Sequence, residues 1–105
     1  MHIQVVTFNL KDMTDGEYRK WCDELAPIFG NMPGLISKVW LEDKAANTYG
    51  GVYTWRDRSA CEAYIKGDIF QALGKHPNIT NASSKEFDII EGPTRISHGL
   101  VPVVA

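Results

Sequence analysis

The sequence predicts an α+β domain in which one four-stranded antiparallel sheet carries its helices on a single face. Three observations favour this class. Four segments have strand composition, two segments with helical periodicity lie between them, and Gly, Pro and Asn mark the boundaries. The chain order is βαββαβ, the ferredoxin-like arrangement. A chain of 105 residues has room for one core, so we expect a single domain over residues 1–105 with a C-terminal tail at 92–105.

The first part of the chain predicts a strand followed by a helix. Residues 2–10 are rich in β-branched and aromatic types, which is typical of a strand. Thr14 and Glu17 have the spacing of a capping box, so a helix should begin here. Its buried face is predicted from apolar residues at helical spacing: Tyr18, Trp21, Cys22, Leu25, Ile28, Phe29 and Met32. Pro27 lacks a backbone N–H, and we expect it to kink or thin the last turn.

The middle of the chain predicts an antiparallel hairpin. Residues 35–42 alternate between two faces, and residues 48–55 resume strand composition after a polar turn. Gly50 and Gly51 interrupt the second of these strands. They predict either a bulge or a close approach to the neighbouring backbone.

A second helix and a last strand complete the order. Asp57 or Ser59 can cap the helix. Its predicted buried residues are Ala60, Cys61, Tyr64 and Ile65, followed by a short further turn that buries Ile69, Phe70 and Leu73. The fourth strand lies within residues 79–91, with its apolar part predicted at Phe87, Ile89 and Ile90. The tail ends in apolar residues that we expect to seek burial.

Composition and charge exclude several classes of partner. A net charge of -2 and a pI near 5.8 give no broad basic field for nucleic acid or anionic lipid. The first residues lack a signal-peptide pattern, and no apolar run approaches the ~20 residues needed to span a bilayer. We therefore expect a cytoplasmic protein with no nucleic-acid or membrane partner. In that reducing compartment Cys22 and Cys61 are expected to be free thiols.

An RNA-recognition domain shares the βαββαβ order and is an alternative class. Residues 49–52 faintly resemble its third-strand signature. However, Gly51 and Val6 stand where stacking aromatic residues would be needed, and the chain is acidic. The sequence therefore disfavours RNA binding.

The predicted sheet is apolar on both of its faces. In the first strand Ile3 and Val5 point to one face, while Val6 and Phe8 point to the other. An antiparallel sheet with one face in water should instead alternate apolar with polar residues. We therefore expect a second copy of the chain to cover the face that the helices leave open, giving a homodimer.

Several motifs in order resemble one family. These motifs are Pro33-Gly34, Lys38-Val39-Trp40, Gly50-Gly51-Val52-Tyr53 and Ser59-Ala60-Cys61-Glu62-Ala63-Tyr64. Together with the strand around Phe87, they resemble the YdhR-type monooxygenase family over about residues 30–95. The resemblance implies the dimeric α+β barrel of the antibiotic-biosynthesis monooxygenase superfamily, with a pocket between sheet and helices in each protomer.

The resemblance also implies a range of activities. Some relatives oxidise aromatic polyketides without metal or flavin, the substrate anion itself reducing oxygen, while others degrade haem or are isomerases or lyases. We therefore expect a cofactor-independent monooxygenase acting on a small aromatic or polyketide-like molecule. A cyclase or isomerase without oxygen chemistry, and a non-catalytic ligand-binding protein, stay open as alternatives. The quinone-forming relatives carry an Asn four residues before a Trp; Trp55 matches the Trp as a catalytic candidate, whereas Gly51 replaces the Asn.

Two histidines are the candidates for a catalytic base. His76 lies in a loop and His98 in the tail, and an imidazole near its ordinary pKa suits the deprotonation of a phenol or an acidic C–H. The alternative for each is an ordinary surface residue. His2, His76 and His98 share no ligand spacing with one another or with a carboxylate, so we expect no metal site.

Five further residues are candidates for substrate binding. Trp21, Trp40 and Tyr53 could wall a pocket for a flat aromatic ligand, with core or dimer interface as the alternative. Lys38 could pair with an anionic substrate, with a solvated or salt-bridged cation as the alternative. Asn9 closes the first strand, where the relatives place a polar pocket residue, or it makes a turn contact.

Overall fold

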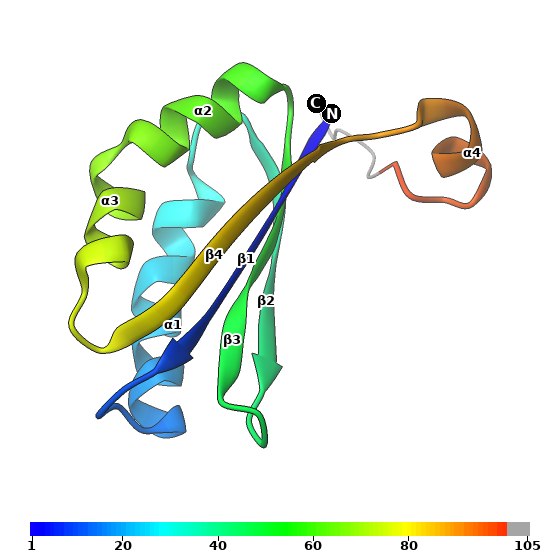
Figure 1. The fold of residues 1–105 in the computed structure, drawn as a ribbon. Helices are drawn as coiled ribbons and strands as arrows, with labels where there is room; N and C mark the ends of the chain where they lie inside the picture. The colour runs from blue at the N-terminus through cyan, green and yellow to red at the C-terminus, as the bar shows by residue number, and fades with distance from the viewer. Residues whose placement is uncertain (101–105) are drawn as a thin grey trace.

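The computed structural model describes residues 1–100 of the chain and has the predicted fold class (Figure 1). The elements are β1 (His2–Leu10), α1 (Asp15–Gly30), β2 (Leu35–Asp43), β3 (Thr48–Trp55), α2 (Arg58–Lys66), α3 (Asp68–Lys75), β4 (Ile79–Asp88) and α4 (Glu91–Ile96). The four strands form one antiparallel sheet in the order β2-β3-β1-β4. Figure 1 shows α1, α2 and α3 on one side of the sheet and α4 beyond its other side.

The helix-covered face of the sheet carries the core. Alternate residues of β1 are buried, from His2 through Val6 to Leu10, because a strand turns every second side chain to the same face. The buried apolar residues of the core are Val6, Phe8, Leu10, Tyr18, Phe29, Tyr49, Tyr53, Trp55, Cys61, Tyr64 and Ile79. Aromatic rings dominate this set, so large flat side chains surround the space between sheet and helices.

Helix α1 begins at the predicted capping box. The Glu17 N–H donates to Thr14 Oγ1 at 3.1 Å, and the Thr14 N–H donates to Glu17 Oε1 at 2.9 Å. The helix continues through Pro27 to Gly30. The prediction that Ile28 lies on the buried face is wrong, because its side chain is 48% exposed on the helix side of the molecule. Phe29, one residue further on, takes the buried position.

Helix α2 is capped by Asp57, one of the two residues predicted as its N-cap. Asp57 is its N-cap and accepts a hydrogen bond from the Ala60 N–H at 2.9 Å. The predicted further turn is a separate helix, α3, which packs Ile69, Phe70 and Leu73 against the core. Cys22 and Cys61 are free, as expected.

Gly50 makes the close backbone approach that the sequence predicted. Its φ is +153°, and a Cβ built on it would lie 1.8 Å from the carbonyl oxygen of Val6 on β1. No other residue type fits here without moving β1. The predicted alternative, a bulge at this point, is not what the pairing shows, because the β1–β3 register runs unbroken from His2 to Asn9.

The C-terminal part departs most from prediction. Strand β4 ends at Asp88, so Ile89 and Ile90 lie outside it, and Ile90 is 75% exposed. The predicted tail contains the short helix α4, where Ile96 is also largely exposed. The apolar end of the tail, residues 101–105, lies outside the described residues. Across residues 1–100, no helix has the length and apolar character to cross a membrane.

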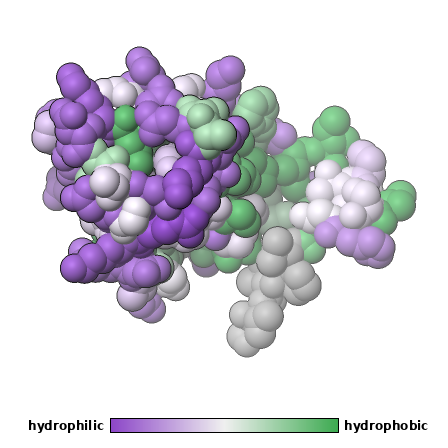
Figure 2. Space-filling model, turned by 90° about the horizontal axis from the view of Figure 1, so that it is seen from below, coloured by the Kyte–Doolittle hydropathy of each residue, from purple (hydrophilic) through white to green (hydrophobic). Residues whose placement is uncertain are grey.

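The other face of the sheet is apolar, and no helix formed by residues 1–100 covers it. Cross-strand pairing brings together Ile3, Val5, Val39, Leu41, Val52 and Phe87 on this open face. Val39 is 57% exposed and Phe87 is 52% exposed. In Figure 2, hydrophobic residues gather on the side turned toward α4, while the side that carries the helices is mainly hydrophilic. An apolar surface of this kind on a sheet face is typical of an interaction surface.

Candidate functional site

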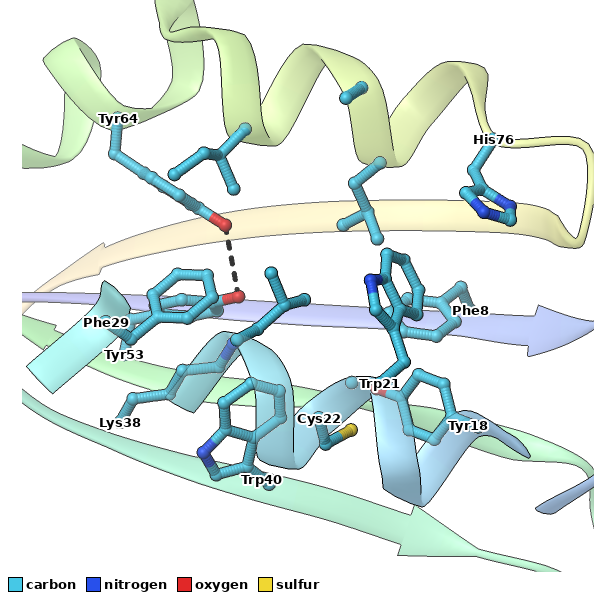
Figure 3. Close-up of a pocket in the computed structure, with 15 residues that line it drawn as sticks. Phe8, Tyr18, Trp21, Cys22, Phe29, Lys38, Trp40, Tyr53, Tyr64 and His76 are labelled. Atoms are coloured by element: carbon cyan, nitrogen blue, oxygen red, sulfur yellow. Dashed lines mark hydrogen bonds between the residues drawn. The ribbon is translucent and has the colours of Figure 1, made fainter. Parts of the chain in front are cut away.

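A cavity of about 260 Å³ lies between the helix-covered face of the sheet and helices α1 to α3 (Figure 3). Its lining residues are Phe8, Tyr18, Trp21, Cys22, Leu25, Phe29, Lys38, Trp40, Gly50, Tyr53, Tyr64, Ile69, Ala72, Leu73 and His76. Aromatic and aliphatic side chains form most of this wall. A few polar groups reach into it, which is the usual make-up of a small-molecule site.

Strands β2 and β3 position the polar end of the cavity. Lys38 is the cross-strand partner of Tyr53, and Trp40 is the partner of Gly51, so all four residues share the helix-covered face. Because Gly51 has no side chain, the stem of Lys38 can lie across it. A Cβ at position 51 would come within 3.0 Å of Lys38 Cε. Gly51 therefore makes room for the lysine.

The Lys38 amine lies among aromatic rings. Its Nζ is 3.5 Å from the ring centroid of Phe29, 3.4 Å from that of Trp40 and 4.7 Å from that of Tyr53 (Figure 3). No carboxylate within residues 1–100 forms an ion pair with it. Burial lowers the pKa of Lys38 to about 7, and the neighbouring Cys22 opposes the shift weakly.

The aromatic rings act in the opposite direction and favour the charged amine, since the interaction of a cation with the face of an aromatic ring is worth ~0.5–2 kcal/mol. Two opposing effects thus act on one group. Loss of water disfavours the ammonium form, and the rings favour it. The amine is held where it can exist in both forms near neutral pH.

Tyr53 and Tyr64 form a pair of hydroxyl groups beside the lysine. Their oxygens are 3.3 Å apart, and the pair joins β3 to α2 across the cavity. Burial raises the pKa of both phenols. Both hydroxyls are therefore neutral near pH 7, and because one of them donates to the other, the accepting hydroxyl keeps its own proton for a ligand oxygen.

His76 and Trp21 form the opposite end of the cavity. Their ring centroids are 5.0 Å apart. His76 Nδ1 accepts a hydrogen bond from the Asn78 backbone N–H at 3.1 Å. A neutral ring in this arrangement carries its proton on Nε2. The imidazole can then donate a hydrogen bond through Nε2–H. The basic lone pair on Nδ1 already accepts the Asn78 N–H.

Five of the eight residues predicted for catalysis and substrate binding line this cavity: His76, Trp21, Lys38, Trp40 and Tyr53. Phe29 and Tyr64 also line the cavity and contact its polar groups, whereas the sequence predicts both only as core residues. Their helical spacing predicted burial, and no sequence signal separates a core ring from a cavity wall.

The other three predicted residues lie elsewhere. Trp55 is fully buried in the core, where its Nε1 donates to Gln4 Oε1 at 3.0 Å. Asn9 makes the turn contact that was its alternative, donating to the Asn47 carbonyl at 2.8 Å. His98 is exposed and follows α4, which Figure 1 shows on the far side of the sheet from the cavity.

One group outside the cavity has metal-ligand chemistry. Ligand atoms of His2, Cys61 and Glu86 lie within 4.8 Å of one another. Carboxylates hold both ring nitrogens of His2: Nε2 is 2.8 Å from Glu86 Oε1, and Nδ1 is 3.0 Å from Asp88 Oδ1. Burial raises the pKa of the Cys61 thiol to about 12, so its thiolate form is disfavoured. These contacts give the cluster a structural role, in which it connects β1, β4 and α2.

The chain was compared with known protein families and structures. The family profile described as "Putative mono-oxygenase ydhR" matches residues 3–100. The chain belongs to this ydhR family. A comparison with curated proteins found no match.

Solved structures similar to this ydhR-family chain share its fold at low sequence identity. A "putative antibiotic biosynthesis monooxygenase" from Deinococcus radiodurans has 18% identity and a TM-score of 0.72, covering 88% of this chain and 95% of the other. A variant of SnoaB, a cofactor-independent oxygenase from Streptomyces nogalater, has 18% identity and a TM-score of 0.68, covering 86% and 93%. The haem-degrading MhuD from Mycobacterium tuberculosis, with two haems bound, has 23% identity and a TM-score of 0.67, covering 86% and 96%.

Proposed function

We propose that this ydhR-family protein is a cofactor-independent oxygenase acting on a small, flat, electron-rich aromatic molecule of the polyketide type. The observation that supports the proposal is the cavity beneath α1 and α3, which combines aromatic walls with an amine at one end and an imidazole at the other. Its volume of about 260 Å³ is slightly below the ~300–1,000 Å³ usual for ligand pockets, so it suits a small ligand.

The proposed chemistry begins with deprotonation of the substrate. Loss of a proton from a phenol or a doubly activated C–H gives an electron-rich anion. That anion donates electrons to oxygen, one oxygen atom enters the product as a carbonyl, and the other leaves as water. The protein supplies the base, a flat binding surface and a hydrogen-bond donor for the developing oxyanion, which here is the hydroxyl pair of Tyr53 and Tyr64.

The similarity to SnoaB, a cofactor-independent oxygenase, supports this proposal at the level of the fold only, since the sequence identity is 18%. The local chemistry supports it more directly. Trp40 and Trp21 present large flat surfaces, and no Asp or Glu is among the lining residues to repel an anion.

Oxygen uptake with the hydroxyanthrone dithranol tests the proposed function. We expect uptake that depends on the protein, with a quinone as product. The matched variants are Trp40→Leu, which removes a flat wall and should cut the rate, and Ile28→Ala, which changes an exposed position outside the cavity and should not. Product formation without oxygen uptake would favour a cyclase or isomerase, and tight binding without product would favour a ligand-binding protein; either outcome contradicts the oxygenase.

We further propose that two copies pair through the open face into a homodimer. The exposed apolar side chains of that face support this, and so do Ile90 and Ile96 on the segment beyond it. The cytoplasmic location stays a prediction from the sequence.

Sedimentation of two matched variants tests the homodimer. Val39→Lys puts a charge on the open face, and Ile28→Lys puts the same charge at a similarly exposed apolar position on the helix side. We expect wild type and Ile28→Lys to sediment as dimers at micromolar concentration and Val39→Lys to sediment as a monomer. A Val39→Lys protein that stays dimeric would contradict the proposed interface.

A further inference from the structure

We propose that Lys38 is the proton acceptor of the cavity: its uncharged amine takes the proton of a bound phenol or acidic C–H, and the resulting ammonium then pairs with the substrate anion. The inference rests on the proposed function in one respect, that the cavity is the substrate site. It goes beyond the sequence-based expectation, in which Lys38 was a binding cation and a histidine was the base.

The position of the amine carries the inference. Lysine is rarely buried unless it is paired, yet Lys38 forms no ion pair and no side-chain hydrogen bond within the described part of the chain. In that same part, every fully buried polar side-chain atom has a hydrogen-bond partner. The unpartnered Nζ is therefore not sealed off and stays open to the cavity that it lines.

The surroundings of the amine suit both of its protonation states. The other ionisable side chains that line the cavity are Tyr18 and Cys22 from α1, Tyr53 from β3, Tyr64 from α2 and, at the far end, His76. None of these is a carboxylate that would hold the amine permanently charged. Burial lowers the pKa of Lys38 to about 7, and the faces of the aromatic rings stabilise the ammonium once it has formed.

The other titratable groups of the cavity are less suited to accept the proton. The basic Nδ1 of His76 already accepts the Asn78 N–H. Burial raises the pKa of the Cys22 thiol and of the three lining phenols, so these groups stay protonated near pH 7; the phenols are those of Tyr18, Tyr53 and Tyr64. Lys38 is the lining residue that combines a free lone pair with an accessible position.

The step is balanced within the cavity. The O–H or C–H bond of the substrate breaks, an N–H bond forms on Nζ, and the electron pair stays on the substrate as an anion. No net charge is created, because the neutral amine and neutral substrate become an ammonium–anion pair. Later electron transfer to oxygen comes from the substrate anion, and Lys38 takes no part in it.

Two variants separate a base from a simple positive charge. Lys38→Met removes both roles, whereas Lys38→Arg keeps a positive charge on a long stem but cannot accept a proton near neutral pH. We expect both to lose oxygen uptake with dithranol by about 10²- to 10⁴-fold, the range of general base catalysis. His76→Gln is the control for the rival base and should lose far less. An active Lys38→Arg protein would overturn the inference, since a purely electrostatic role survives that change.

A measurement without oxygen keeps this inference separate from the oxygenase proposal. Under argon at pH 7.5, wild-type protein should bind dithranol as its anion, seen by the red-shifted absorbance, while Lys38→Met should bind it in the neutral form. This result without oxygen uptake would support the base and refute the oxygenase. Oxygen uptake by Lys38→Met at the wild-type rate would support the oxygenase and refute Lys38 as the base.

The reactivity of the amine supplies a readout that needs no ligand. Trace acylation with acetic anhydride, quantified by mass spectrometry across a pH series, reports the fraction of each lysine that is unprotonated. Lys38 should titrate near pH 7, and the exposed Lys20 provides the internal comparison. A Lys38 midpoint near the ordinary lysine value, or a wild-type complex that leaves dithranol neutral, would overturn the assignment.

Discussion

Gln4 and Lys38 both lie on the sheet face that the helices cover, yet their polar groups have opposite surroundings. Gln4 is fully buried, and both polar atoms of its side chain have hydrogen-bond partners. Its Oε1 accepts the indole N–H of Trp55 at 3.0 Å and faces the Cys61 thiol at 3.7 Å, and its Nε2 donates to Ser84 Oγ at 3.0 Å. The Lys38 amine lies among aromatic rings and, within residues 1–100, forms no ion pair or side-chain hydrogen bond.

This difference distinguishes a residue with a structural role, Gln4, from a residue that is free to react, Lys38, on the same face of the sheet. A buried polar group whose hydrogen bonds are all made contributes to a unique packing, and it has no capacity left for a ligand. A buried amine without a partner costs stability, and its protonation responds to whatever enters the cavity. The end of the face around Gln4 and Trp55 is therefore a closed core, and the end around Lys38 is the functional one.

The largest expected effect concerns the pH dependence of stability at Lys38. The pKa is about 7 in the folded chain against 10.5 ordinarily, so between these values the unfolded chain binds a proton that the folded chain does not. Stability from this group therefore rises with pH, by up to about 1.4 kcal/mol per unit. In urea unfolding, wild type should gain about 2–3 kcal/mol more than Lys38→Met between pH 7 and pH 9. Equal gains in the two proteins would contradict the account.

The matching change at the closed end is Gln4→Leu. It leaves the buried indole N–H of Trp55 without an acceptor, so we expect a loss of about 1–3 kcal/mol in the free energy of unfolding. Urea unfolding measures it, and the loss should be the same at pH 7 and pH 9, since no titrating group is removed. Ile28→Ala, at an exposed position, is the control and should stay within about 0.5 kcal/mol of wild type. A Gln4→Leu protein as stable as wild type would show that the network does not matter.

A smaller effect is expected at the hydroxyl pair of the cavity. Tyr53→Phe removes one partner of the 3.3 Å contact with Tyr64 and should cost about 0.5–1.5 kcal/mol. The midpoint of Lys38 acylation should stay near 7 in this variant, because burial, the main cause of its low pKa, is kept. A midpoint that moved up to the ordinary lysine value would place the cause in the hydroxyl pair instead.

The smallest structural change is Gly51→Ala. The added methyl group would lie 3.0 Å from Lys38 Cε, so the flexible lysine stem should shift away from the rings while the fold is kept. We expect the midpoint of Lys38 acylation to rise as the amine gains water. An unchanged midpoint would show that Gly51 does not position the lysine.

The sequence predicted most of the fold because its signals are local. The capping box at Thr14, the cap at Asp57 and the close approach at Gly50 each depend on a few neighbouring residues. Ile28 was misplaced because helical spacing alone does not say where the buried face ends. Helix α4 was missed because Gly92 and Pro93 are typical of a turn, although proline is tolerated in the first turn of a helix.

The candidate site was predicted only in part, because it depends on which distant residues meet. Lys38 and Trp40 carried the resemblance, but nothing in the order of residues places Phe29 beneath the amine or leaves the lysine without a carboxylate. The engagement of His76 Nδ1 by a backbone N–H two residues on is likewise a feature of the folded loop. These tertiary contacts decide which group is free to act.

The most direct test of the account is the titration of Lys38 by NMR. Protein labelled with ¹³C at the lysine ε-carbons reports the protonation of each amine through its chemical shift, and the signal missing from Lys38→Arg identifies Lys38. The account predicts a midpoint near pH 7, well below the ordinary lysine value of 10.5. A midpoint at or above 10 would show that Lys38 is a permanently charged cation and would contradict its role as the base.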